Sequence, residues 1–211
     1  MKQLVIFDLD GTLLNTSAGI IHCYNATARH FGAAPADKPR FQGIIGAGLK
    51  DGFTELFGLD DSTAEQAVAH YRVLYKQTGM HMYEIYPGIA QLLVKLHKTG
   101  VRTAVATLKL EKFAKLMLAE AGLVFDAVFG EDGTGLSKAH LLEQAMARLN
   151  IPPGQSVLVG DSIYDAQGAQ QAGMDFIAVT YGWGFTGRED AARSYHSAIA
   201  ETVQELEDIL L

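Results

Sequence analysis

The chain has 211 residues, of which 24 are acidic and 17 are Lys or Arg, so its formal net charge is −7. This acidic balance argues against a general binder of nucleic acid polymers or of anionic membranes. The single cysteine, Cys23, excludes an intrachain disulfide framework and a cysteine-rich zinc site, and it favours a reducing compartment. Apolar runs are only as long as strands, and the first residues lead directly into one. We therefore expect neither a membrane span nor a signal peptide, and a cytoplasmic location.

Short apolar runs alternate with helical patterns along most of the chain. The runs predict strands at Leu4–Phe7, Thr103–Ala106, Ala127–Phe129, Val157–Val159 and Phe176–Val179. Several of them are apolar throughout, which is typical of strands buried on both faces of a parallel sheet. Apolar residues at helical spacing lie between the runs and in the tail after Val203. The sequence therefore predicts an α/β fold with a doubly wound, mostly parallel sheet of five or more strands.

One stretch interrupts this alternation. Roughly seventy residues after the first run contain no strand candidate, and this length is too great for a loop. Apolar positions at helical spacing predict helices over residues 20–31 and 49–57. Ser62 and Glu65 form a capping-box pattern, which predicts the start of a third helix.

The helical stretch divides the chain into two predicted domains. Residues 16–82 form a small helical insert, and residues 1–15 and 83–211 together form the core domain. We expect the hinges between them near Asn15–Thr16 and Glu84–Pro87.

Two carboxylates follow the first run, in the sequence Phe7-Asp8-Leu9-Asp10-Gly11. Because side chains alternate along an extended chain, Asp8 and Asp10 can face the same side. Adjacent carboxylates repel each other unless a cation lies between them, and a hard divalent cation such as Mg²⁺ takes oxygen ligands. An acidic turn is the alternative interpretation. The place at the carboxyl end of a buried strand favours a ligand site, because open α/β sheets bind ligands there.

A second acidic pair follows the run at Val157–Val159. Asp161 comes after Gly160, and Asp165 lies about one helical turn later if a helix begins near Ser162. Asp165 would then return towards the same mouth, and Asp161 would be a third oxygen ligand. Taken alone, Asp161 is better explained as a helix N-cap.

A hydroxyl and a lysine occur at corresponding places in the chain. Thr107 follows the run at Thr103–Ala106, where we expect a helix to begin, and N–H groups at a helix start favour an anion such as phosphate. A plain N-cap explains Thr107 equally well. Lys138 lies at another predicted helix start, where a cation opposes the helix dipole. Lys138 could neutralise phosphate and the crowded carboxylates, whereas a solvated lysine is the simpler alternative.

Considered together, the four segments predict a single site. Each follows a strand candidate, on the side where a doubly wound sheet has its crevice. Three acids, a hydroxyl and a lysine then converge, and such a set suits phosphoryl transfer to a carboxylate nucleophile.

The four motifs resemble those of the haloacid dehalogenase superfamily, and within it the phosphoglycolate-phosphatase-like branch. Asp8-Leu9-Asp10-Gly11-Thr12-Leu13 is similar to the family's first motif, and Thr107 and Lys138 match the second and third. Gly160-Asp161-Ser162-Ile163-Tyr164-Asp165 matches the fourth. The resemblance covers essentially the whole chain. It implies a Rossmann-like core whose first strand lies between the Thr107 and Asp161 strands, with the helical insert as a small cap.

The resemblance also implies roles for these residues. Asp8 attacks phosphorus and becomes an aspartyl-phosphate, while Asp10 protonates the leaving group and then activates water. Thr107 and Lys138 bind the transferring phosphoryl group. Four acidic residues are implied for Mg²⁺, namely Asp8, Asp10 through its main-chain carbonyl, Asp161 and Asp165.

Other residues bear on the substrate. Leu108 stands where the family often has Asn, which removes a polar side chain near the substrate, and Ala139 replaces a common Pro after Lys138. The Gly-rich segment Gly43–Lys50 is a candidate substrate loop, with Lys50 as a candidate cation for an acidic substrate. Weaker candidates for the cleft or for contact with the cap are His22, Tyr24 and Trp183.

The resemblance implies a Mg²⁺-dependent phosphatase of small phosphomonoesters, with phosphoglycolate as the typical substrate. Its partner would be a small phosphorylated metabolite, and the protein would be a monomer or a homodimer. Within the family, Lys50 could instead form a Schiff base, as in phosphonoacetaldehyde hydrolysis, or the phosphoryl group could pass to a sugar, as in a phosphomutase. A non-catalytic regulatory domain that binds a phosphate ligand is the alternative from another class.

Overall fold

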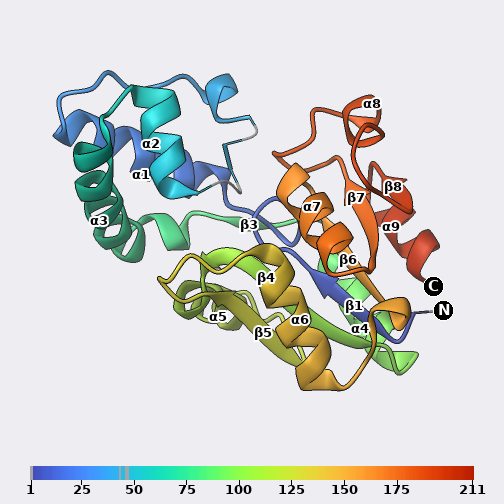
Figure 1. The fold of residues 1–211 in the computed structure, drawn as a ribbon. Coiled ribbons are helices and arrows are strands. Elements are labelled where there is room, and N and C mark those ends of the chain that lie inside the picture. The colour runs from blue at the N-terminus through green and yellow to red at the C-terminus, as the bar shows by residue number, and fades with distance from the viewer. Residues whose placement is uncertain (1, 43, 46–47) are drawn as a thin grey trace.

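The computed structural model describes residues 2–42, 44–45 and 48–211, and a parallel sheet lies at its centre (Figure 1). Six strands follow the order β5-β4-β1-β6-β7-β8, and each neighbouring pair is parallel. They are β1 (Leu4–Phe7), β4 (Arg102–Leu110), β5 (Ala127–Glu131), β6 (Ser156–Gly160), β7 (Asp175–Val179) and β8 (Ala198–Ala200). The predicted doubly wound α/β fold is confirmed. The sequence analysis missed β8, because three residues at a sheet edge form too short an apolar run.

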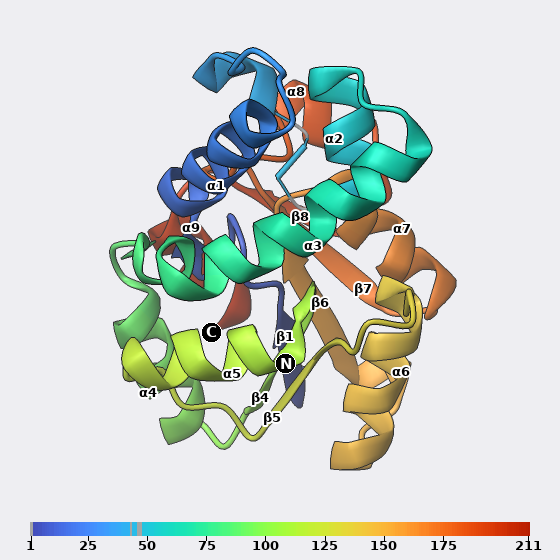
Figure 2. The ribbon, with the colours of Figure 1, turned by 90° about the vertical axis from the view of Figure 1, so that its left-hand side faces the viewer.

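Strand β1 lies between β4 and β6, as the family resemblance implied. Its alternate side chains enter different apolar layers, since Val5 and Phe7 belong to one buried cluster and Leu4 and Ile6 to the other. Figure 2 shows α4, α5 and α9 on one face of the sheet and α6 and α7 on the other. The central strand is therefore buried on both faces, which explains its uninterrupted apolar sequence.

Helices cover both faces of this sheet. They are α4 (Ile89–Lys98), α5 (Glu111–Glu120), α6 (Lys138–Leu149), α7 (Ile163–Gln171), α8 (Arg188–Ala191) and α9 (Val203–Leu210), with a 3₁₀ turn at Pro153–Gln155. Among the described residues, no helix combines the length and the apolar character that crossing a membrane requires.

Residues 16–82, which we call the helical insert, form a layer beyond the carboxyl end of β1 (Figures 1 and 2). Its elements are α1 (Ser17–His30), α2 (Leu49–Phe57) and α3 (Asp61–Gln77), with 3₁₀ turns at Lys38–Phe41 and Gly79–His81. The buried ring of Tyr24 lies 4.7 Å from that of Phe53 and 5.0 Å from that of Tyr71, measured between centroids. The insert thus packs around an aromatic cluster contributed by its three helices.

The two segments predicted as hinges pair with each other. Strand β2 (Leu14–Asn15) runs antiparallel to β3 (Glu84–Ile85), with Leu14 opposite Ile85 and Asn15 opposite Glu84. These two short strands escaped the sequence analysis because two residues carry no alternation. The division of the chain at these points stays a prediction.

The start of α3 corrects one sequence prediction. The N-cap is Asp60, whose carboxylate accepts hydrogen bonds from the Thr63 N–H at 3.0 Å and the Thr63 hydroxyl at 2.9 Å. Ser62 therefore lies within the first turn, and Glu65 pairs with Lys50 instead of closing a capping box. A carboxylate at the N-cap that accepts two hydrogen bonds caps the helix more effectively than the hydroxyl of Ser62, two residues later.

Truncation inside the aromatic cluster should destabilise the protein strongly. Phe53 is fully buried, so Phe53→Ala is expected to lower the free energy of unfolding by about 3 to 5 kcal/mol in urea denaturation. Val73, on α3, is 59% exposed, and Val73→Ala should change it by less than about 0.5 kcal/mol. Equal effects of the two substitutions would contradict a packed aromatic core in the insert.

Candidate active site

Asp8 and Lys138 meet at the carboxyl end of β1. The Lys138 Nζ donates to Asp8 Oδ1 at 2.6 Å and to the Ala106 carbonyl at 2.9 Å, and it lies 2.7 Å from Asp165 Oδ1. All three side chains are buried. One ammonium thus contacts a carboxylate at the end of β1, a second on α7 and the backbone of β4.

The position of Lys138 follows from local structure. It is the first residue of α6, as predicted, and Ser137 caps this helix by accepting a hydrogen bond from the His140 N–H. Gly168 on α7 makes room for the lysine stem, because a Cβ there would lie only 2.5 Å from Lys138 Cγ. Burial alone would lower the pKa of Lys138, but the Asp165 and Asp8 carboxylates raise it above its ordinary value.

Asp161 and Asp165 follow β6, and each has one oxygen that accepts hydrogen bonds from the protein. The Asp161 Oδ2 accepts from the N–H groups of Trp183 at 2.7 Å and Gly184 at 2.9 Å. Ser162 caps α7 and forms a capping box with Asp165, whose Oδ2 accepts from the Ser162 hydroxyl at 2.6 Å. The alternative in which Asp161 is the N-cap is therefore wrong, because Ser162 takes that place.

Three buried carboxylates converge here as a possible cation site. Single oxygens of Asp8, Asp161 and Asp165 all lie within 4.8 Å of one another. Asp165 Oδ1 forms the ion pair with Lys138 but accepts no hydrogen bond from any described residue. With all three ionised and one lysine among them, two negative charges remain uncompensated. Hard oxygen donors with this excess charge fit a divalent cation such as Mg²⁺.

The electrostatics of the cluster favour binding of a cation. Burial raises the pKa of Asp8 to about 7 against the opposing effect of Lys138, and the nearby Asp165 and Asp10 carboxylates add to the rise. Burial also raises the pKa of Asp161 well above its ordinary value, again with Asp165 and Asp8 contributing. Like charges held together without water favour protonation, and a bound cation removes that penalty.

Asp10 has a different set of partners, one of which the sequence analysis missed. Both of its carboxylate oxygens accept hydrogen bonds from the Lys109 Nζ, at 3.0 and 2.9 Å, and Oδ1 also accepts from the Thr16 hydroxyl at 2.5 Å. The Lys109 Nζ also lies 4.6 Å from the centre of the Tyr75 ring on α3. Burial alone would lower the pKa of Lys109, but Asp10 raises it above its ordinary value.

The place of Thr107 corrects a second prediction. It lies inside β4, which continues to Leu110, and the next helix, α5, begins only at Glu111. The strand pairing shifts between Thr107 and Leu110, and the Thr107 hydroxyl accepts from the Lys109 N–H at 3.2 Å. Thr107 is therefore neither a helix cap nor at a helix N-terminus. A longer predicted strand would have placed Lys109 on the same face as Thr107.

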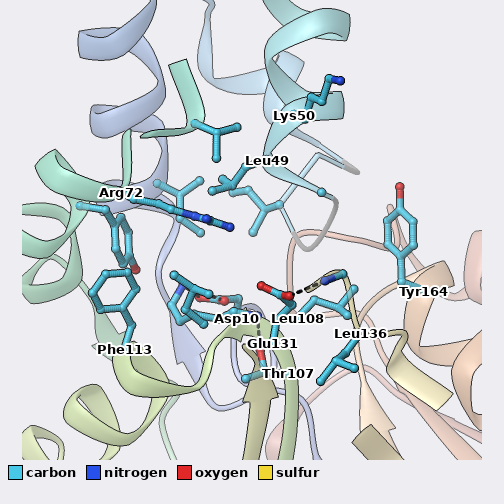
Figure 3. Close-up of a pocket in the computed structure, with 18 of the residues that line it drawn as sticks. Asp10, Leu49, Lys50, Arg72, Thr107, Leu108, Phe113, Glu131, Leu136 and Tyr164 are labelled. Atoms are coloured by element: carbon cyan, nitrogen blue, oxygen red, sulfur yellow. Dashed lines mark hydrogen bonds and ion pairs between the residues drawn. The ribbon is translucent and has the colours of Figure 1, made fainter. Parts of the chain in front are cut away.

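A cavity of about 630 Å³ lies between these groups and the helical insert (Figure 3). Its lining includes Asp8, Asp10, Thr107 and Lys138 from the core, and Leu108 is half-buried beside them. The insert contributes mostly apolar and aromatic side chains, among them Ile20, Tyr24, Leu49, Val68, Tyr71 and Tyr75. This volume is within the range of small-molecule binding sites.

The other insert residues singled out from the sequence differ in their position. Tyr24 lines the cavity, although its ring is packed in the aromatic cluster, whereas His22 is exposed and not part of the lining. Lys50 also borders the cavity, but its ammonium binds Asp61 at 2.9 Å and Glu65 at 3.1 Å, and Figure 3 shows it directed away from Asp10. The proposed substrate loop Gly43–Lys50 includes residues 43 and 46–47, which lie outside the described residues.

Trp183 connects the acidic cluster to the insert. Besides its N–H bond to Asp161, its indole Nε1 donates to Asn15 Oδ1 at 3.2 Å, and its carbonyl accepts from the Gln42 side chain at 2.7 Å. The predicted contact between Trp183 and the helical stretch is thus present, together with Lys38 at 5.2 Å from the ring centre.

Removing the buried lysine beside Asp10 should be costly even without substrate. The Lys109 and Asp10 side chains are only 9% and 10% exposed, so Lys109→Ala should lower the free energy of unfolding by about 3 kcal/mol at neutral pH. Lys115 forms an exposed pair with Glu111, and Lys115→Ala should cost no more than about 0.5 kcal/mol. Urea denaturation of both variants measures this difference, and similar small effects would contradict a buried ion pair at Asp10.

Comparisons with known proteins identify relatives over the whole chain. "Tyrosine-protein kinase PtkA" of Mycobacterium tuberculosis (strain ATCC 25618 / H37Rv) is 36% identical over 99% of this chain and 72% of that protein. "Phosphoglycolate phosphatase" of Pseudomonas putida (strain KT2440) is 30% identical over 87% of this chain and 71% of that protein. The solved structure of a "predicted phosphatase from Clostridium acetobutylicum" is 33% identical, covers 100% of this chain and 98% of its own, and has a TM-score of 0.92.

A family model supports the same assignment. The model described as haloacid dehalogenase-like hydrolase matches residues 5–179, which include every strand-end motif described above. This confirms the family that the sequence motifs resembled. The chain belongs to the haloacid dehalogenase-like hydrolase family.

Proposed function

We propose that the chain is a Mg²⁺-dependent phosphatase of small phosphomonoesters that works through an aspartyl-phosphate on Asp8. Within its family it is a phosphoric monoester hydrolase. The observation that carries the finer proposal is the buried cluster of Asp8, Asp161 and Asp165, in which Lys138 pairs with Asp8 and Asp165 beside the cavity. Related proteins with phosphatase names support the same reaction type.

Asp8 is suited to act as the nucleophile. One of its oxygens attacks phosphorus while the ester P–O bond breaks, which leaves the phosphoryl group on Asp8 and releases an alkoxide. Lys138, held against Asp8 at 2.6 Å, stabilises the negative charge of the phosphoryl group as it transfers. Thr107, which lines the cavity next to Asp8, offers a hydroxyl donor to the same oxygens.

Asp10 is suited to move protons. As an acid it donates a proton to the leaving alkoxide, and as a base it takes a proton from the water that hydrolyses the aspartyl-phosphate. Inorganic phosphate leaves and Asp8 is restored. The Lys109 Nζ, which donates to both Asp10 oxygens at 3.0 and 2.9 Å, holds this carboxyl group in position for both steps.

Asp8, Asp161 and Asp165 would hold Mg²⁺, and Asp10 would add its main-chain carbonyl. When bound, the ion supplies positive charge beside the transferring phosphoryl group and offsets the repulsion among the carboxylates. The donor set fits, because all three carboxylates are buried and the protein occupies only one oxygen of Asp161 with hydrogen bonds.

The helical insert would act as a cap that closes over the substrate. Its apolar lining excludes water from the floor of the cavity, which favours attack by Asp8 over competing reactions. Leu108, in place of a polar residue, extends this apolar wall from the core side. The partner would be a small phosphorylated metabolite, acted on in the cytoplasm by a monomer or a homodimer.

A second candidate function concerns the acceptor in the second half-reaction. The relative named as a tyrosine-protein kinase favours a reaction in which a hydroxyl group, rather than water, takes the phosphoryl group. A phosphomutase would share this feature. The Schiff-base alternative is less favoured, because the hydrogen bonds that Lys50 donates to Asp61 and Glu65 raise its pKa and keep it charged. A non-catalytic domain would have no chemical need for this cluster.

Loss of the nucleophile should abolish turnover. Asp8→Asn replaces a carboxylate with a poorly nucleophilic amide, so phosphate release from a phosphomonoester panel with Mg²⁺ should fall to background. Asp10→Asn should slow release severely, and least for esters whose leaving groups need no proton, such as 4-nitrophenyl phosphate.

Asp208→Asn is the matched control for these variants, because Asp208 is exposed on α9 and does not line the cavity. Its rate should equal that of the unaltered protein. Release of phosphate and alcohol in equal amounts identifies water as the acceptor, whereas alcohol in excess of phosphate indicates transfer to another hydroxyl. Unchanged turnover by Asp8→Asn would refute the mechanism.

Mg²⁺ should stabilise the fold more at about pH 8 than at about pH 5.5. Because folding raises the pKa of Asp8 to about 7, the metal-free protein loses stability as pH rises from the unfolded value through 7. Below that range protons compete with Mg²⁺ for the carboxylates, and above it the ion offsets their repulsion. At a Mg²⁺ concentration one hundred times its Kd, the free energy of unfolding should rise by about 2.7 kcal/mol.

Thermal unfolding with and without Mg²⁺ at both pH values measures this difference. Asp161→Asn should remove most of it. Fluorescence of the single tryptophan, Trp183, gives an independent readout, since its backbone N–H donates a hydrogen bond to Asp161. A Mg²⁺ effect that is the same at both pH values, or larger at the lower one, would contradict the proposed site.

A further inference from the structure

Arg72 lies on α3, and its side chain extends into the cavity. Its Nε is buried and has no hydrogen-bond partner among the described residues, and within that same set no carboxylate forms an ion pair with it. Figure 3 shows the guanidinium in the space between Leu49 of the insert and Asp10 of the core. A buried donor left without an acceptor destabilises a protein unless a ligand supplies one.

The other cations around the cavity already have anionic partners. Lys138 contacts Asp8 and Asp165, and Lys109 contacts Asp10. Lys50 contacts Asp61 and Glu65 on the far side. Among the described lining residues, Arg72 is therefore the cationic side chain that is available to pair with a bound anion.

The acidic residue of the cavity wall that could compete for Arg72 is Glu131, at the end of β5. Its Oε1 accepts hydrogen bonds from the N–H groups of Gly133 and Gly135, each at 2.7 Å. Glu131 thus holds its own loop, and the structure contains no ion pair between it and Arg72. An Arg72–Glu131 contact that forms only on closure of the insert is the competing explanation, which the experiment below separates.

The surroundings of Arg72 indicate what its ligand is attached to. Apolar and aromatic side chains of the insert line the cavity, including Ile20, Val68 and Tyr71. Asp8, at the end of β1, and Lys138, on α6, line it from the core, and Figure 3 shows Asp10 and Thr107 on the core side of the cavity, across from Leu49 of the insert. A molecule that spans the cavity would therefore place its phosphoryl group on the core and its other end near the guanidinium.

We propose that Arg72 binds a second anionic group, a carboxylate or a phosphate, on the leaving-group side of the substrate. A planar guanidinium pairs with either group through two parallel hydrogen bonds. Arg72 then selects phosphomonoesters whose alcohol carries such an anion over those whose alcohol is neutral. This inference rests on the proposed phosphatase function and specifies its substrate class.

Matched esters test the selection directly. We would measure kcat/KM with Mg²⁺ for ethyl phosphate against phosphoglycolate, propyl phosphate against 3-phosphooxypropionate and 1,3-propanediol bisphosphate, and phenyl phosphate against 4-carboxyphenyl phosphate. The unaltered protein should prefer the anionic member of at least one set by about tenfold to a hundredfold, the range of a hydrogen bond to a charged group. Comparison of the carboxylate-bearing esters with the bisphosphate shows which anion Arg72 binds.

Arg72→Met keeps the apolar stem and removes the charge, so it should lose this preference while neutral esters change by less than about twofold. Arg72→Lys should retain part of it. Arg29→Ala is the control, because Arg29 is an exposed arginine on α1 and its loss changes the net charge equally. Thermal unfolding of each variant confirms that it is folded.

The possible outcomes are distinct. Hydrolysis without any preference for an anionic alcohol, or an equal loss for neutral and anionic esters in Arg72→Met, would overturn the inference and leave the phosphatase intact. An equal loss that Glu131→Gln reproduces would assign Arg72 to closure of the insert. Failure to hydrolyse any ester would refute the proposed function, and the inference would fall with it.

Discussion

The arrangement of this site depends on one electrostatic constraint. Three buried carboxylates, Asp8, Asp161 and Asp165, lie around a single ammonium, that of Lys138. One positive charge cannot offset three negative ones in a place that water does not reach. The raised pKa values of Asp8 and Asp161 express that imbalance. A divalent cation would supply the two positive charges that the cluster lacks, which is why we propose a metal site here.

The fold concentrates these charges through strand order. Because β1 lies between β4 and β6, the residues that follow the three strands reach the same edge of the sheet. Most of the neutralising contacts then come from helix starts and tight turns. Gly11, with φ of +88°, passes so close to Asp161 that a Cβ there would lie 2.1 Å from its Oδ2. On the other side, a Cβ at Gly182 would lie 2.3 Å from the same oxygen, and the next two N–H groups, of Trp183 and Gly184, donate to it. Glycines therefore make room for the Asp161 carboxylate between two loops.

Periodicity predicted the sheet and most helices, because these elements bury an apolar face that the sequence records directly. The convergence of Asp8, Asp161 and Lys138 was also predicted, since each directly follows a strand or starts a helix, and that of Asp165 because it lies about one helical turn after Asp161. Lys109 was missed because the strand of Thr107 continues beyond the predicted run Thr103–Ala106, through a shift in pairing. Arg72 was missed for a different reason. On α3 it belongs to an ordinary helical pattern, and only the placement of the insert over the sheet reveals what it faces.

The charged groups on the two sides of the cavity suit different tasks, the reaction on the core side and the choice of substrate on the insert side. On the core side, each lysine is engaged with a carboxylate that takes part in the proposed reaction, so it cannot also discriminate among leaving groups. On the insert side, the apolar walls would favour many alcohols about equally, and in our proposal Arg72 supplies the directional contact. Lys109 connects the two sides, because it binds Asp10 and also lies against Tyr75, which is one helical turn from Arg72 on α3. The group proposed to move protons is therefore held by a lysine that itself packs on the insert.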